Sequence, residues 1–128
     1  MNWMRLFDLR GTNLWLIAAS VGCNVIWTAL TLFLGISVLG SGESAVAIVQ
    51  LALMVSEFLG PLLCGWFIGW MAADGRGLTY GLIGSLGSVA LILFTLFSTG
   101  ITGLMVAVVA LAGGLNGGLL SERRRLRK

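Results

Sequence analysis

Four long apolar stretches, separated by short polar segments, make up nearly the whole chain. They predict membrane-spanning helices over residues 13–38, 45–72, 78–97 and 101–120, because about 20 apolar residues cross the hydrocarbon core of a bilayer. The uncharged stretch between Arg76 and Glu122 is too long for one span, and we expect its turn in the Ser-, Thr- and Gly-containing segment 97–103. The pattern predicts one all-α membrane domain over residues 1–128, built as an antiparallel bundle of four helices.

The composition agrees with a lipid environment. Hydrophobic residues make up 58% and charged residues 10% of the chain, whereas soluble domains carry about 25% charged residues. Residues 1–12 alternate apolar and charged side chains, which is typical of a short interfacial segment lying in the headgroup layer. We interpret this segment as an anchor and not as a cleaved signal, because the uncharged stretch that follows is too long for a signal peptide.

The basic residues predict the orientation. All eight lie in the N-terminal segment, in the loop around Arg76 or in the tail over residues 121–128, so with four spans they share one side. The positive-inside tendency makes that side the cytoplasm of a plasma (inner) membrane, with both termini cytoplasmic. No basic groove suggests nucleic acid. We expect the tail to contact anionic lipid or a partner protein through Arg123, Arg124, Arg125, Arg127 and Lys128.

Several classes of chemistry have little support. The chain contains no His, and its two cysteines, Cys23 and Cys64, lie in separate apolar stretches. This argues against zinc, iron–sulfur and His-dependent catalytic sites, and we expect no cofactor and no metal. We interpret the thiols as small hydrophobic side chains, with a disulfide as the alternative. Few charged residues lie at the interfaces, and we expect no enzyme activity.

The second predicted span carries the unusual chemistry of the chain. Glu57 is the only charged residue between Glu43 and Asp74. Pro61 lacks an N–H and therefore frees the carbonyl group of Glu57, four residues earlier. Helical spacing places Gln50 on the same face of this span. Counting from the helix ends brings Asn24 and Thr28 of the first span to a similar depth. The candidate intramembrane polar site is therefore Glu57, Asn24, Thr28, Gln50 and Pro61.

Two interpretations of Glu57 remain open. As a structural group, it fixes the register of two helices through a hydrogen bond. As a functional group, it binds an ion, a proton or a cationic solute. In either case we expect a neutral carboxyl, because desolvation disfavours the charged form and no buried Arg or Lys offsets that cost.

Small residues recur at helical spacing along the third and fourth predicted spans. Such residues let helix backbones approach closely, and close packing is what holds helices together in lipid. The sequence does not indicate whether the partner helix belongs to the same chain. The predicted helix-packing positions are Gly77, Gly81, Gly84, Gly103, Gly114, Gly117 and Gly118.

Three glycine-containing segments, Gly60–Gly69, Arg76–Gly84 and Ala112–Gly118, resemble those of small four-span bacterial membrane proteins. The resemblance covers most of the chain and implies the four-span architecture. It implies no catalytic residue. Small multidrug-resistance transporters and fluoride channels are of similar size, but the position of Glu57 and the one-sided charges match neither group well.

From these patterns we expect a non-enzymatic packing or accessory subunit of a homo- or hetero-oligomeric membrane assembly, because four short spans with glycine faces favour contact with another copy or another subunit. The alternative is a small ion, proton or cationic-solute conduit that uses Glu57. Glu57→Gln separates the two, since Gln keeps the hydrogen bonds of a neutral carboxyl and cannot ionise.

Overall fold

The computed structural model describes residues 9–39, 46–96 and 100–125. These residues form four helices: α1 (Leu14–Leu39), α2 (Val46–Ala72), α3 (Gly77–Leu96) and α4 (Ile101–Arg125). All four are long and apolar enough to cross a membrane, and the chain is a multi-pass membrane protein. Helix α4 continues five residues past the predicted end of the fourth span at 120. The predicted interfacial segment lies mostly outside the described residues.

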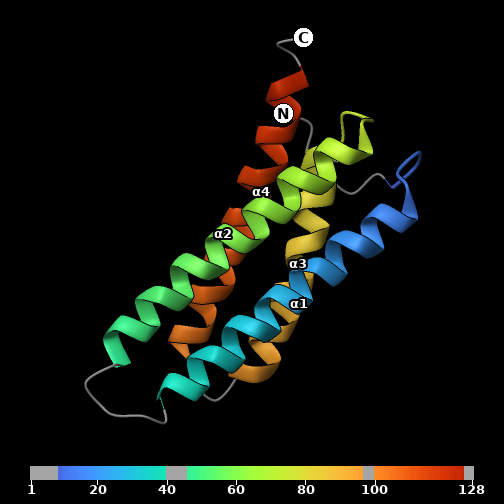
Figure 1. The fold of residues 1–128 in the computed structure, drawn as a ribbon. Coiled ribbons are helices and arrows are strands. Elements are labelled where there is room, and N and C mark those ends of the chain that lie inside the picture. Colours follow the sequence, from blue (N-terminus) through green and yellow to red (C-terminus); the bar gives the residue numbers. More distant parts are fainter. Residues whose placement is uncertain (1–8, 40–45, 97–99, 126–128) are drawn as a thin grey trace.

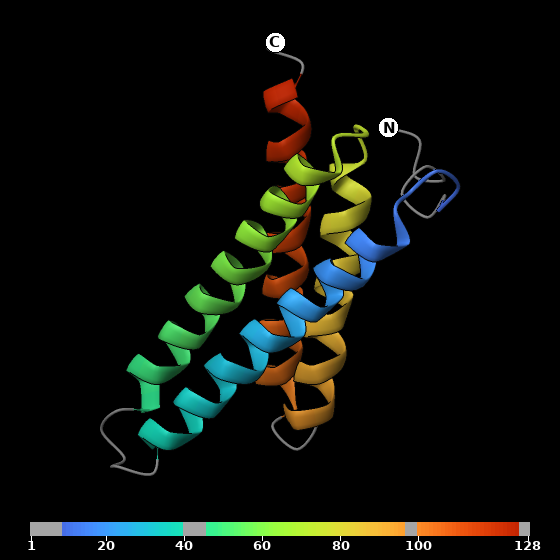
Figure 2. The same ribbon diagram turned by 45° about the vertical axis from the view of Figure 1, so that its right-hand side comes forward.

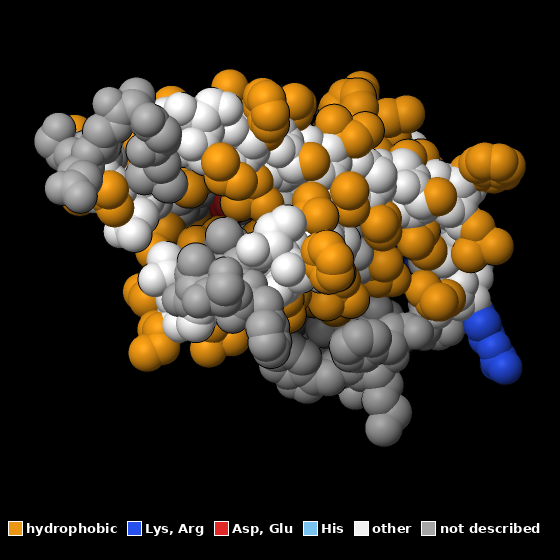
Figure 3. Space-filling view, turned by 90° about the horizontal axis from the view of Figure 1, so that it is seen from below, with side chains coloured by type: hydrophobic (Ala, Val, Ile, Leu, Met, Phe, Trp, Pro, Cys, Tyr) orange, Lys and Arg blue, Asp and Glu red, His pale blue; other side chains and the backbone are white. Residues whose placement is uncertain are grey.

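The helices alternate in direction along the chain (Figure 1). The starts of α1 and α3 and the ends of α2 and α4 lie at one end of the bundle, which we call the charged end because Asp74, Arg76 and Glu122 lie there. The opposite end is called the far end. Viewed from the far end, hydrophobic side chains project on all sides of the described bundle (Figure 3), as expected where its sides face lipid.

Side-chain caps fix the charged end. The amide oxygen of Asn13 accepts a hydrogen bond from Trp15 N at 3.0 Å and so caps the start of α1. Glu122 of α4 accepts one from Leu78 N at 3.0 Å, in the first turn of α3. The turn between α2 and α3 contains two residues with positive φ, Ala73 at 53° and Gly75 at 77°. Gly75 adopts this conformation without the steric cost that a side chain would add.

Helices α2, α3 and α4 pack through glycine near the charged end. A Cβ added to Gly114 would lie 2.5 Å from the carbonyl oxygen of Gly81, and one added to Gly118 would lie 2.6 Å from that of Gly77. A Cβ on Gly117 would collide with the carbonyl oxygen of Leu62 in α2. These backbones can therefore approach only because no side chain intervenes.

The predicted glycine positions other than Gly103 thus face neighbouring helices of the same chain. Gly84 is in contact with Ser20 and Asn24 of α1, and Gly103 is buried. Among the described residues, the glycine faces of α3 and α4 are occupied by contacts within the chain. A second copy would therefore need another surface.

Helix α1 lies on α2 and α3 and makes no contact with α4 within the described ranges. Figure 2 shows the α1–α2 pair leaning across the steeper α3–α4 pair, with the far ends of the two pairs set apart. Only 22% of the spanning windows of α1 and α2 is buried, compared with 44% for α3 and α4. Because α1 contacts α2 and α3 but not α4 in the described structure, it lies along one side of the other three helices.

Contacts between α1 and α2 follow a regular antiparallel order. Cys23 faces Cys64. One turn further along α1, the ring of Trp27 covers Gly60, and its Nε1 donates to the carbonyl oxygen of Ser56 at 3.0 Å. A further turn on, Thr31 bonds to Glu57. This register places the carboxyl of Glu57 against α1 near the middle of the bundle.

Candidate functional site: a buried carboxyl between a polar column and an apolar groove

Glu57 of α2 is completely buried, and α1 supplies partners for both of its carboxyl oxygens. Thr28 donates to Oε2 at 2.8 Å, and Thr31 bonds to Oε1. Both threonines lie on the same face of α1, about one turn apart. The carboxyl is therefore oriented by hydroxyl groups, and no Lys or Arg of the described residues forms an ion pair with it.

A column of buried polar side chains leads from this carboxyl towards the charged end. It runs between α1 and α3, and we call it the polar column: Thr28, Ser88, Asn24, Ser20 and Tyr80. Thr28 Oγ1 is 2.8 Å from Ser88 Oγ. Ser20 Oγ donates to the carbonyl oxygen of Tyr80 at 2.9 Å. At the end of the column the Tyr80 hydroxyl donates to Asp74 at 2.7 Å and accepts from Asn13 N at 2.9 Å.

Asn24 is the one member of the column with an unpaired atom. Its Nδ2 donates to the carbonyl oxygen of Ser20 at 2.8 Å, while its Oδ1 is buried without a hydrogen-bond partner. A buried polar atom without a partner is unfavourable, and a bound water molecule commonly satisfies such an atom. The polar column therefore contains an unused hydrogen-bond acceptor, Asn24 Oδ1, one turn of α1 nearer the charged end than Thr28.

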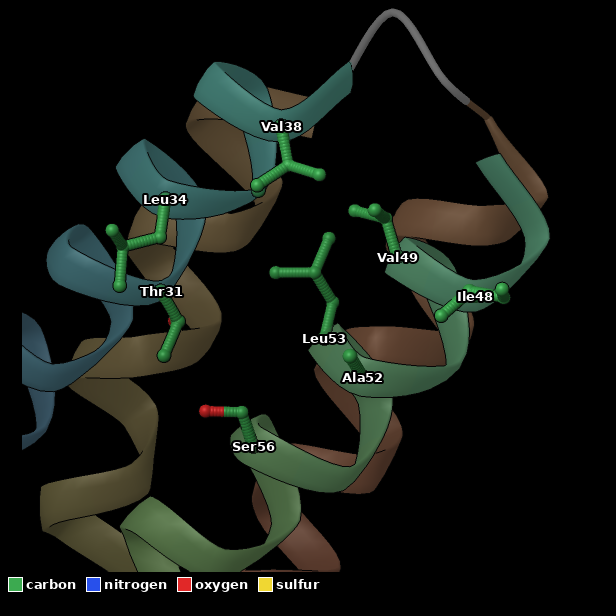
Figure 4. A pocket seen from close by; sticks show the side chains of 9 residues that line it. Thr31, Leu34, Val38, Ile48, Val49, Ala52, Leu53 and Ser56 are labelled. Carbon is green, nitrogen blue, oxygen red and sulfur yellow. The ribbon is translucent and has the colours of Figure 1, made fainter. Parts of the chain in front are cut away.

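On the other side of Glu57, a groove of about 300 Å³ opens between the far halves of α1 and α2. Figure 4 shows Val38 of α1 facing Val49 and Leu53 of α2 across it. Gly35 contributes to its width, because a Cβ there would lie 3.0 Å from the Leu53 side chain. The hydroxyls of Thr31 and Ser56 are the polar groups of its lining.

The predicted site is assembled only in part. Thr28 contacts Glu57 directly, whereas Asn24 lies one turn of α1 nearer the charged end, where its side chain donates to the carbonyl oxygen of Ser20 instead. Pro61 is buried within α2, one turn after Glu57, and the helix continues through it. Gln50 is exposed and does not join the group, although the spacing placed it on the face of Glu57.

Two hydroxyl groups of the hydrogen-bond network around the carboxyl, those of Thr31 and Ser88, were not among the predicted site residues. The spacing of three residues between Thr28 and Thr31 places both on one face of α1, and it was the signal that could have identified Thr31. Ser88 lies four residues after Gly84 and continues the small-residue stripe of α3. Its hydroxyl contacts Thr28, and nothing in the sequence of α3 alone indicates that contact.

The predicted lipid-contact residues lie at the charged end where the structure describes them. Arg123 is exposed, and Arg124 lies 5.6 Å from the centroid of the Trp66 ring, a cation–π distance. Arg125 ends α4. Arg127 and Lys128 lie outside the described residues.

Within residues 9–39, 46–96 and 100–125, no three His, Cys, Asp or Glu side chains group as metal ligands. Comparison with models of protein families, with curated proteins and with solved structures found no match to the chain. The interpretation of the site therefore depends on its own geometry.

Proposed function

We propose that the chain is a small, non-enzymatic membrane conduit in which Glu57 binds a proton or a cationic solute. One observation carries this proposal. The two oxygens of a single buried carboxyl contact different surroundings, Oε2 the polar column through Thr28 and Oε1 the groove through Thr31. A group in that position can exchange a proton or a counter-charge between the two sides of the bundle.

The hydrogen-bond inventory favours a protonated carboxyl in the resting state. The hydroxyls of Thr28, Thr31 and Ser88 hold three protons, yet they make five contacts with one another, with Glu57 and with two backbone carbonyls. With an ionised carboxyl, two of these contacts would lack a proton. A protonated carboxyl supplies a fourth proton, and it also avoids an unpaired charge in lipid.

The polar column suits a proton better than a metal cation. Thr28 Oγ1 is in direct contact with Glu57 and with Ser88 at 2.8 Å, which leaves no room for an ion between these oxygens, whereas a proton passes along such a contact. Beyond Ser88, the next side-chain acceptor is the unpaired Oδ1 of Asn24. A water molecule bound there would extend the relay towards Ser20 and Tyr80.

The groove suits a different species. Its lining is apolar except for Thr31 and Ser56, so it would reject a hydrated metal ion, which pays a large desolvation cost in such surroundings. A cation with an apolar body, such as an alkylammonium, would place its body in the groove and its charge towards Glu57. Binding of that cation requires the carboxyl to release its proton, and we propose the polar column as the route for that proton.

The proposed exchange is tested by proton release. Purified protein in weakly buffered detergent solution is mixed with octyltrimethylammonium, and the pH change is recorded with an indicator dye. The expected result is release of one proton per chain, and none from Glu57→Gln, because Gln has no proton to exchange. Asn116→Leu is the matched control: Asn116 is exposed and bonds only within its own helix, so its proton release should equal that of the parent.

Proteoliposomes test transport itself. With a trapped pH dye, the parent should dissipate an imposed proton gradient when octyltrimethylammonium is added outside, and Glu57→Gln should behave as empty liposomes do. Size-exclusion chromatography and circular dichroism establish that the variant is folded. A folded Glu57→Gln variant with full proton release and full flux would contradict the proposal.

A second candidate function is the packing or accessory subunit of a membrane assembly. The observation that favours it is the low burial of α1 and α2, whose far halves leave the groove between them open to a neighbour. Its test is the mass of the detergent-solubilised protein by light scattering. A monomer that purifies alone removes the support for this function and leaves the conduit proposal unaffected.

For either function we propose that the charged end faces the cytoplasm, with the helices in a bacterial inner membrane. Arg76, Arg123 and Arg124 all lie at that end, in agreement with the positive-inside tendency. In this orientation the polar column leads to the cytoplasm, and the groove opens in the outer leaflet. The basic tail would then contact the anionic lipid of the inner leaflet.

A further inference from the structure

Cys23 of α1 and Cys64 of α2 meet side by side, although each lies in a separate apolar helix. Their sulfur atoms are 2.7 Å apart. A disulfide bond is about 2.05 Å long, so the two sulfurs need to approach by only about 0.65 Å to form one. Both cysteines are free thiols. We propose that they are a redox site: a dithiol that closes to an α1–α2 disulfide on two-electron oxidation.

Neighbouring contacts hold the two thiols together. The register of α1 on α2 is fixed one turn away by the indole of Trp27, which lies over Gly60 and donates to the carbonyl oxygen of Ser56. Two turns away, the hydrogen bond between Thr31 and Glu57 fixes the same register. Because these contacts determine which residues face each other, the thiols stay opposed in the folded bundle.

The position of the pair indicates the class of its oxidant. Counting about 1.5 Å per residue, Cys23 lies about 14 Å from the start of α1 and Cys64 about 12 Å from the end of α2. Both are therefore within the hydrocarbon thickness. Cys64 is buried and Cys23 is exposed on the surface that faces lipid, so the reagent must arrive through the bilayer and meet Cys23 first. A lipid-soluble two-electron acceptor of the quinone class meets this requirement.

The reaction balances without a further reagent. The two thiols lose two protons and two electrons as the sulfur–sulfur bond forms. The quinone takes up the same two protons and two electrons and becomes the quinol. A dithiol reductant reverses the reaction by exchange through a mixed disulfide. Oxidation would join α1 to α2 two turns from Glu57, and the inference does not depend on transport at that residue.

The test uses the full chain in liposomes with decylubiquinone, whose fully substituted ring resists addition of a thiol. Remaining thiols are alkylated after denaturation and located by mass spectrometry, and quinol formation is followed by absorbance. The parent should lose both thiols together, form one quinol per chain and stay monomeric on a non-reducing gel.

The control keeps two thiols at the same depth but separates them. In the double variant Cys64→Ser, Leu63→Cys, the second thiol occupies a half-exposed, lipid-facing position of α2. It should keep both thiols and form no quinol under the same conditions. Three results would overturn the proposal: thiols that survive in the parent, equal loss in the control, or a disulfide that links two chains.

Discussion

Thr31 is the residue through which the carboxyl of Glu57 meets the groove, and its hydroxyl also lies 3.0 Å from the carbonyl oxygen of Thr28. Thr31→Val removes both contacts with little change in shape. Hydrogen bonds between helices in a membrane are worth about 0.6 kcal/mol on average and up to about 1.7. We expect a loss of about 1 kcal/mol in the free energy of unfolding, measured by titration with denaturing detergent.

The control for this substitution is Thr95→Val. Thr95 is exposed and its hydroxyl bonds only to carbonyl oxygens of its own helix, such as that of Leu91 at 2.7 Å. The change there should cost much less, and Thr31→Ser should restore most of the stability. Equal losses at positions 31 and 95 would show that Thr31 contributes no bond between helices.

Asn24 gives a residue-scale test of the relay, because its Oδ1 has no partner within the protein. Asn24→Leu removes the spare acceptor and the proposed water position. We expect slower proton flux in proteoliposomes at unchanged stoichiometry of proton release, since Glu57 itself is intact. Flux equal to that of the parent would place the proton route elsewhere.

At the residue scale, the sequence predicted how deep each polar residue lies in the membrane better than it predicted which residues contact each other. Thr28 and Glu57 were expected near the same level, and they are in contact. Gln50 shares a helix face with Glu57 but is exposed. Helical periodicity identifies the residues on one face of α2, but it does not indicate how much of the length of that face a neighbouring helix covers. Between the far halves of α1 and α2 the groove opens instead.

At the scale of helices, the glycines of α3 and α4 set the spacing of the core. Gly114→Ala would place a Cβ 2.5 Å from the carbonyl oxygen of Gly81 and 2.6 Å from Ser85 Cβ, so the two helices must separate. Overpacking of this kind typically costs about 1–3 kcal/mol. We expect that loss in the free energy of unfolding, with no change in oligomeric mass.

Gly22→Ala is the matched control, since a Cβ at this position of α1 meets nothing within 4 Å. It should leave the stability unchanged or raise it by up to about 1 kcal/mol, because Ala is the better helix former. Should Gly114→Ala instead dissociate an oligomer and leave the monomer stable, the glycine contacts would be between chains.

The four helices themselves could be predicted from the sequence almost completely. The observed bounds of α1, α2 and α3 lie within one residue of the predicted spans, because the apolar stretches and their polar breaks determine where a chain can cross lipid. Which helices touch was beyond prediction. A stripe of small residues indicates that a helix packs closely against another helix. It does not identify that other helix, because several helices of the chain carry such stripes.

At the scale of the whole molecule, the alternation of helix direction places Gly75 at the charged end and the ends of α1 and α3 at the far end. Ser41 and Thr99 follow those two helix ends in the sequence. Single cysteines at these three positions, in a chain without Cys23 and Cys64, test the proposed orientation with a membrane-impermeant maleimide. In intact cells, the positions at Ser41 and Thr99 should react and the one at Gly75 should not. Labelling of Gly75 alone would reverse the orientation.

Within the described residues α1 contacts α2 and α3 but not α4, and this position has a consequence for biosynthesis. α1 is made first, yet Ser20 donates to the backbone of Tyr80 on α3, which leaves the ribosome some 60 residues later. Until then these buried polar groups of α1 face lipid or the insertion machinery. A chain stopped after α2 should therefore be degraded in cells faster than one stopped after α3, as measured by pulse-chase, and a Ser20→Ala substitution should reduce that difference.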